Sequence, residues 1–149
     1  MVSLRHFTAE DIPAMRSIYQ AMTEDEIREM LADWQTMEHE GRYFEMFAVC
    51  DGNEIVGEIS LYQHSKSSAS IGPTIYETFR RRGYGRQAMS LAILRARELG
   101  YRILIQQVSC DNKASIALHN SLGFELDGYG YVYKNRKDHS CYLFLMALT

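Results

Sequence analysis

A turn rich in glycine and arginine, placed between a strand and a helix, constrains this chain more than any other feature. The turn runs from Arg80 to Gly85 (Arg-Arg-Arg-Gly-Tyr-Gly) and separates an extended segment at 71–76 from a helix expected over about 85–99. Free backbone N–H groups and the helix dipole make such a helix start an anion site. Gly83 and Gly85 permit positive φ and close approach of a ligand. The turn therefore predicts a site for a polyphosphorylated ligand, with guanidinium donors from the arginines and from Arg86.

Composition limits the class of protein. The chain has 149 residues, 46% of them hydrophobic and 23% charged, which fits one globular domain. A net charge of −3 argues against a general nucleic-acid binder. The longest apolar run, Tyr142 to Leu148, is far shorter than the roughly 20 residues of a membrane helix, so no membrane association is expected. Three distant cysteines predict free thiols and a cytoplasmic location.

Periodicity and end signals predict an α/β fold, more closely an α+β mixed sheet flanked by helices, with residues 1–149 forming a single domain. Thr23 and Glu26 form a capping box that should open the second helix. The residues at 64–70 are polar and serine-rich, and they are expected to form a loop. The expected order is α-α-β-β-β-α-β-α-β-β, with helices at about 8–22, 23–38, 85–99 and 112–122, and strands at 45–50, 54–61, 71–76, 101–108, 124–134 and 141–148.

A second motif follows the 101–108 strand. Asn112 opens a short helix, His119 stands seven residues later, and Leu122-Gly123-Phe124 closes the segment. Together with the arginine–glycine turn and the order of elements, this motif resembles the GNAT superfamily of acyl-CoA-dependent N-acetyltransferases. The resemblance covers nearly the whole chain, and its specific motifs lie within residues 71–124.

The resemblance implies acetyl-CoA as cosubstrate. No metal is expected, because no His or Cys cluster has metal-ligand spacing. Backbone groups near Thr74 and Ile75 would pair with the pantetheine arm, Asn112 would hydrogen-bond the same arm, and the turn would hold the pyrophosphate. The implied cofactor-binding residues are Thr74, Ile75, Arg80, Arg81, Arg82, Gly83, Tyr84, Gly85, Arg86 and Asn112. His119 would lie near the thioester sulfur as the catalytic acid, in a place where many members have tyrosine. The alternative for His119 is a histidine packed on its helix.

No carboxylate occupies the positions where relatives place a general base. Gln107 stands at one such position and Ala69 at the other, which leaves a water chain, Glu58, His64 or no base at all. The alternatives are an outward-facing strand residue for Glu58 and a loop residue for His64. Pro73 removes one backbone N–H from the strand expected to face the thioester carbonyl. Three alternating tyrosines could wall an acceptor pocket or pack across the sheet: Tyr129, Tyr131 and Tyr133.

The predicted function is acetyl transfer to a primary amine of a small molecule or peptide, by direct attack in a ternary complex. Residues 23–40 carry seven carboxylates against Arg28 alone, which could attract a cationic amine or simply be a solvated helix face. A non-catalytic acyl-CoA sensor of the same fold is the alternative. A nucleotide-phosphate enzyme is disfavoured, because no Gly-Lys-Ser/Thr follows the glycines. The oligomeric state stays open, with a homodimer as one option.

Overall fold

The computed structural model describes residues 1–132 and 140–148. Within them lie four α-helices: α1 (Ile12–Ile18), α2 (Glu24–Gln35), α3 (Tyr84–Glu98) and α4 (Lys113–Ser121). Two 3-10 turns, at Ala9–Asp11 and Glu77–Phe79, precede α1 and the arginine turn. The strands are β1 (Val2–His6), β2 (Glu38–His39), β3 (Arg42–Asp51), β4 (Glu54–Gln63), β5 (Ser68–Ile75), β6 (Ile103–Ser109), β7 (Glu125–Val132) and β8 (Ser140–Ala147).

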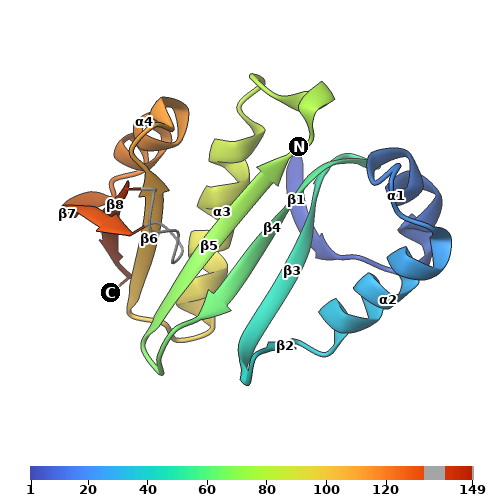
Figure 1. The fold of residues 1–149 in the computed structure, drawn as a ribbon, viewed down its shortest axis with the longest axis horizontal. Coiled ribbons are helices and arrows are strands. Elements are labelled where there is room, and N and C mark those ends of the chain that lie inside the picture. Colours follow the sequence, from blue (N-terminus) through green and yellow to red (C-terminus); the bar gives the residue numbers. More distant parts are fainter. Residues whose placement is uncertain (133–139, 149) are drawn as a thin grey trace.

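One mixed sheet joins all of the strands. The order is β1-β3-β4-β5-β6-β8-β7, and the short β2 pairs with β3 off this path. Every pair is antiparallel except β5–β6. The parallel pairing of β5 with β6 covers only Ser68↔Ile103 and Ala69↔Leu104, so the two strands diverge beyond Ala69. Figure 1 shows this divergence, with α4 on the β6 side of the gap and α3 behind β5.

The predicted fold class and mixed sheet are confirmed, and so are the four predicted helices. Two strands, β1 and β2, are additional to the predicted order. The loop expected at 64–70 is shorter than predicted, because β5 already begins at Ser68. Part of the strand predicted at 124–134 falls outside the described residues.

Two apolar clusters fill the opposite faces of the sheet. The larger contains Phe47, Val49 and Leu104 from the strands and Met89 and Ala92 from α3. The smaller joins α1 and α2 to the sheet, and it includes Met15, Ile27, Ala48 and Ile55. Side chains alternate between the two faces along β3: Phe47 and Val49 face α3, whereas Ala48 between them faces α1 and α2.

The start of α2 shows how the local sequence sets an element. The Thr23 hydroxyl accepts a hydrogen bond from the Glu26 backbone N–H at 3.1 Å, and the Glu26 carboxylate accepts one from the Thr23 N–H at 2.9 Å. This is the predicted capping box, and it satisfies two N–H groups that a helix start otherwise leaves without partners. Because the cap fixes the first turn, Ile27 and Leu31 are turned inward and buried.

A buried carboxylate on β3 links α3 to the sheet. Glu45 on β3 is fully buried, and Arg95 binds it through two nitrogens, at 2.9 and 3.1 Å. His6 on β1 contacts the same carboxylate at 2.7 Å. Burial raises the pKa of Glu45, but the hydrogen bonds from Arg95 and His6 outweigh it and hold the pKa below its ordinary value. The pair thus contributes stability above the unfolded pKa of Glu45 and loses it as the pH falls through the lower folded pKa.

Removing Arg95 should therefore destabilise the fold. Arg95→Met leaves Glu45 buried without its guanidinium, and we expect the free energy of unfolding to fall by about 2–3 kcal/mol. This is less than the roughly 3–5 kcal/mol for a fully buried pair that loses one partner, because Arg95 is partly exposed. Urea unfolding at pH 7 measures the change. Arg97→Met, at an exposed position of the same helix, is the matched control. Equal midpoints for the two variants would contradict this role.

Candidate functional site

Two residues of the arginine turn have a left-handed backbone conformation. Arg81 has φ +67° and Gly83 has φ +82°, and Gly83 is the N-cap of α3. A left-handed conformation is costly for a residue with a side chain, and such strain gathers at functional sites. The conformation leaves the first N–H groups of α3 without a side-chain cap, so they point at the space in front of the helix.

An open groove of about 600 Å³ lies in front of this helix start. Seven of the predicted cofactor residues line it: Thr74, Ile75, Arg80, Arg81, Gly83, Tyr84 and Gly85. Sequence reasoning did not assign Phe79 and Ala114, which also line the groove, and named Pro73 only for its missing N–H. Ala114 is two residues after Asn112, so the groove spans the two motifs that the sequence analysis singled out.

Three of the predicted binding residues do not line the groove. The Arg82 guanidinium lies over the Phe79 ring, 5.7 Å from its centroid. Arg86 donates a hydrogen bond to the Ser121 hydroxyl, linking α3 to α4. The Asn112 side chain caps α4, with its oxygen accepting from the Ser115 N–H at 3.0 Å. The amide nitrogen of Asn112 makes no hydrogen bond to any described residue.

Polar contacts hold the groove walls in place. The Arg80 Nε donates to the Ile75 carbonyl at 3.0 Å, which folds the arginine back over the end of β5. The Tyr84 hydroxyl donates to the Asp51 carboxylate at 2.6 Å, joining the start of α3 to the β3–β4 turn. This hydrogen bond raises the pKa of Tyr84 and lowers that of Asp51. The phenol therefore stays protonated.

A glutamine side chain occupies the place where β5 and β6 diverge. The Gln106 amide accepts from the Ile71 N–H at 2.8 Å and donates to the Ile71 carbonyl at 2.6 Å. Gln106 thus provides both hydrogen bonds that a neighbouring strand would have made to Ile71. The backbone of β5 beyond Ile71 is left free of β6, and this stretch leads to the groove residues Pro73, Thr74 and Ile75.

His119 lies inside the protein, next to the Gln106 side chain. It is only 3% exposed, and its ring packs between Phe124 and Phe144, with centroids 4.9 and 5.5 Å away. Its Nδ1 lies 2.7 Å from the Ser115 carbonyl and its Nε2 lies 3.3 Å from the Gln106 amide nitrogen. Since a carbonyl only accepts, Nδ1 carries the proton and Nε2 accepts from Gln106. Burial lowers the pKa of His119, which favours this neutral form.

Of the two residues considered as bases, Glu58 lies on the α1/α2 side of the sheet, whereas His64 follows the end of β4. Glu58 on β4 accepts hydrogen bonds from two phenols, from Tyr76 at 2.8 Å and from Tyr19. Glu58 is directly opposite Thr74 in the β4–β5 register, so it adjoins the groove. His64 is exposed, and its Nε2 lies 2.9 Å from the Ser70 hydroxyl. His64 does not line the groove.

Comparison with known proteins decides the family. The family described as "Acetyltransferase (GNAT) domain" matches residues 2–125. The chain belongs to the GNAT acetyltransferases. It is an acetyl-CoA-dependent N-acetyltransferase by this membership, which confirms the predicted class of enzyme and the resemblance drawn from the two motifs.

Individual relatives agree with this membership. The uncharacterized N-acetyltransferase YokL, derived from the SPbeta prophage of Bacillus subtilis (strain 168), is 28% identical over 142 residues, covering 85% of this chain and 77% of YokL. Two solved structures share the fold. The putative acetyltransferase yncA of Salmonella typhimurium, with its cofactor acetyl-CoA, has a TM-score of 0.74 at 18% identity, covering 100% of this chain and 95% of that one. Spermidine N-acetyltransferase of Vibrio cholerae, with CoA and spermine, has a TM-score of 0.77 at 16% identity, covering 99% and 95%.

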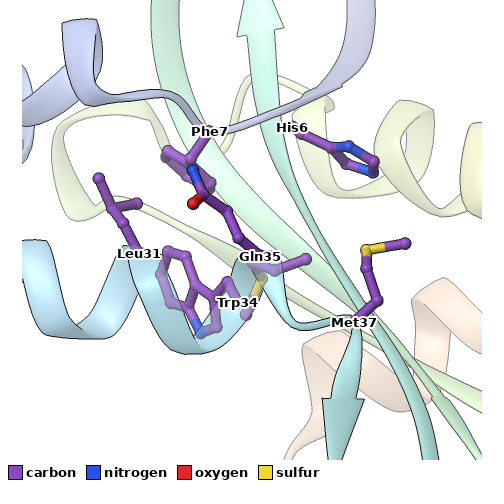
Figure 2. Close-up of a pocket in the computed structure, with 7 residues that line it drawn as sticks. His6, Phe7, Leu31, Trp34, Gln35 and Met37 are labelled. Carbon is purple, nitrogen blue, oxygen red and sulfur yellow. The ribbon is translucent and has the colours of Figure 1, made fainter.

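This GNAT enzyme has a second cavity, which is separate from the groove. It measures about 210 Å³ and lies between α2, the end of β1 and β3. Figure 2 shows the side chains that surround it, among them Phe7, Leu31, Trp34 and Met37. The two cavities share no lining residue. Trp34 is half-buried and packs against Phe7 at 5.2 Å, so the tryptophan helps to seal the smaller apolar cluster.

Other sequence-based expectations bear on limited parts of the structure. Tyr133 lies outside the described residues, as do the side chains of Tyr129 and Tyr131, so the acceptor-wall hypothesis stays a prediction. Among the described residues, no three His, Cys, Asp or Glu side chains gather as metal ligands would. Nor does any described helix have the length and hydrophobicity to cross a membrane.

The two glycines of the turn should respond differently to substitution. Gly85 lies in the first turn of α3, where an added Cβ would be 3.8 Å from Ile75 and Leu118, an ordinary contact. Gly85→Val should keep its melting temperature within a few degrees and raise the Kd for acetyl-CoA more than about tenfold, because the side chain would fill the groove in front of the phosphates. Calorimetric titration with acetyl-CoA measures this. Ser90→Val, on the exposed face of α3, is the control.

Substitution of Gly83 should lower both the stability and the affinity for acetyl-CoA, because φ at this residue is +82°. Gly83→Ala should cost about 1–2 kcal/mol of stability as well as affinity, since a Cβ disfavours the left-handed conformation. Unchanged acetyl-CoA affinity in both glycine variants would show that the turn has a purely structural role.

Proposed function

We propose that the enzyme transfers the acetyl group of acetyl-CoA directly to a primary amine of a small molecule or peptide, within a ternary complex. The observation that carries this proposal is the adjacency of two unlike sites. The first site is the groove, which has an uncapped helix start and several arginines. The second is the half-buried carboxylate of Glu58 on the other side of the sheet, and the two adjoin because Thr74, which lines the groove, is paired with Glu58. Anionic cofactor and cationic acceptor can then meet at β5.

The cofactor would lie along the groove. Its pyrophosphate would accept hydrogen bonds from the backbone between Arg81 and Arg86, and its pantetheine arm would extend along β5 past Thr74 and Ile75. Asn112 has an amide nitrogen available for the same arm. With Pro73 lacking an N–H, the Thr74 or Ile75 N–H would be the donor to the thioester oxygen as charge develops on it.

Proton transfer to the departing thiolate is the step that the sequence assigned to His119. That assignment stays a prediction, and the contacts of His119 favour a supporting role. Its Nε2 carries a lone pair and accepts from Gln106, so the neutral ring has no proton there to give. Burial opposes the charged form that could give one. We propose that His119 orients Gln106, which in turn holds β5 and β6 apart.

Steady-state kinetics test the proposed reaction. Free CoA should be released in the presence of acetyl-CoA and an amine from a panel of spermidine, amino acids, aminoglycosides and short peptides with free N-termini. Double-reciprocal plots against either substrate should intersect, since both bind before the acetyl group moves. Parallel lines, or burst release of CoA without an amine, would indicate an acetylated enzyme instead. Binding of acetyl-CoA with no turnover across the panel would favour the sensor alternative.

Two substitutions separate the roles considered for His119. If His119 supports Gln106, His119→Phe should lower the melting temperature and reduce kcat less than about tenfold, well short of the 10²-fold or more expected for a lost general acid. Gln106→Leu should lower the melting temperature further than His119→Phe, because it also leaves the N–H and the carbonyl of Ile71 without their partner. A loss of kcat of about 10²-fold or more in His119→Phe, with recovery in His119→Tyr and unchanged stability, would establish the acid role.

A further inference from the structure

The edge of β3 that faces β1 and β2 is open over a short stretch. β1 ends where His6 pairs with Phe47. Further along the same edge, the Phe44 N–H donates to the Met37 carbonyl at 3.1 Å. Met46 lies between these two contacts, and no strand of the described chain runs beside it on this edge.

The backbone of Met46 points its N–H and C=O into this opening. Successive residues of a strand direct these groups to opposite sides. The Tyr43 N–H donates toward β4, to Gln63 at 3.2 Å, whereas the next residue, Phe44, donates away from β4. Met46 lies two residues after Phe44, so its N–H and C=O also point away from β4. No described residue hydrogen-bonds to either group on this side.

The second cavity lies against this open backbone, because Met46 is one of its lining residues. Figure 2 shows Phe7, Leu31 and Trp34 grouped on the α2 side, with Met37 across from them. None of the described residues that line the cavity is a Lys, Arg, Asp or Glu. Its volume of about 210 Å³ exceeds the roughly 150 Å³ of a cavity that holds a benzene ring, so one apolar side group fits.

Backbone strain coincides with the cavity. Met37, which lines it, has a left-handed backbone conformation with φ +57°. That conformation is costly for a residue with a side chain, and residues held in this way gather at ligand sites. The Met37 carbonyl closes one end of the opening at Phe44, and the Met37 side chain forms part of the cavity wall.

We propose that this cavity binds a single uncharged amino-acid residue that has an amide bond on each side and an apolar side chain. The ligand's C=O would accept from the Met46 N–H and its N–H would donate to the Met46 C=O, as in one hydrogen-bonded pair of an antiparallel sheet. The two side chains of such a pair point to the same face of the sheet. Met46 packs into the smaller apolar cluster with Leu31 and Trp34, so the ligand's side chain would enter the cavity beside them.

The opening limits the length and the charge of the ligand. The pair His6↔Phe47 closes one end and the bond from Phe44 to Met37 closes the other, so a longer added strand would meet these segments. A charged ligand would lose hydration without an ion pair in return. The site is also separate from the groove, because β4 lies between β3 and β5 and the two cavities share no lining residue.

The fluorescence of Trp34, the only tryptophan of the chain, reports on this site directly. N-acetylphenylalaninamide should change it saturably, with a Kd of about 1 mM or below. N-acetylglycinamide, which lacks the ring, and toluene, which lacks the amides, should each bind at least about tenfold more weakly. Equal binding of either control compound would overturn the proposal, and so would the absence of a saturable change with N-acetylphenylalaninamide at about 10 mM.

Two substitutions at one position test the backbone contact. Met46→Pro removes the N–H, and proline is tolerated on a strand where the N–H faces no partner. Met46→Ala is the matched control, because it also shortens the side chain but keeps the N–H. We expect Met46→Pro to bind N-acetylphenylalaninamide at least about tenfold more weakly than Met46→Ala, and equal affinities would contradict the proposed pairing.

Thermal unfolding checks that both variants fold. If Met46→Pro does not, the amide proton resonance of Met46 in the wild type replaces it: N-acetylphenylalaninamide should shift this resonance and toluene should not, and an unshifted resonance would overturn the proposal. Saturating acetyl-CoA should leave the Kd for N-acetylphenylalaninamide within twofold. Displacement of the compound by acetyl-CoA would locate it in the groove and overturn the separate site. None of these measurements requires acetyl transfer, so their outcome is independent of the proposed function.

Discussion

The parallel pairing of β5 with β6 stops after two residue pairs, so the backbone of β5 beyond it needs other hydrogen-bond partners in the middle of the sheet. Gln106 supplies them at Ile71, since its amide can both donate and accept. An apolar residue there would leave an N–H and a carbonyl of Ile71 unsatisfied, at a cost of about 1–3 kcal/mol for each group. The side-chain bridge lets β5 and β6 diverge without that penalty, and the divergence gives β5 a free edge for an extended ligand.

The parts of the site that could be predicted from sequence are those set by local backbone chemistry. The glycine turn, the caps at Thr23 and Asn112 and the helix after Gly83 each need only neighbouring residues, and all four are present. Arg82 and Arg86 were assigned to phosphate because arginine suits it, but their side chains contact Phe79 and Ser121. Guanidinium groups reach several angstroms from the backbone, so sequence position alone does not determine where they bind.

The parts that could not be predicted depend on contacts between residues far apart in sequence. β1 pairs with β3 across some forty residues or more, and its five residues carry no turn or periodic signal of their own. The bridge by Gln106 and the meeting of Tyr19, Glu58 and Tyr76 likewise depend on how the strands align. Glu58 was weighed as an outward strand residue or a base. Only the register and the two phenols distinguish it from an ordinary solvated glutamate such as Glu54.

The sheet separates two kinds of charge, and this separation bears on the direction of attack. The groove that would hold the anionic cofactor collects helix N–H groups and arginines at the start of α3, whereas the α1/α2 side carries Glu58 and the acidic first turn of α2. An anion drawn to the first region is repelled by the second, and the reverse holds for an ammonium. Thr74 on β5 adjoins both, since it lines the groove and is paired with Glu58 on β4. In the proposed reaction the amine and the thioester would meet at this part of β5, so the charge pattern would bring the nitrogen to the carbonyl carbon from one side.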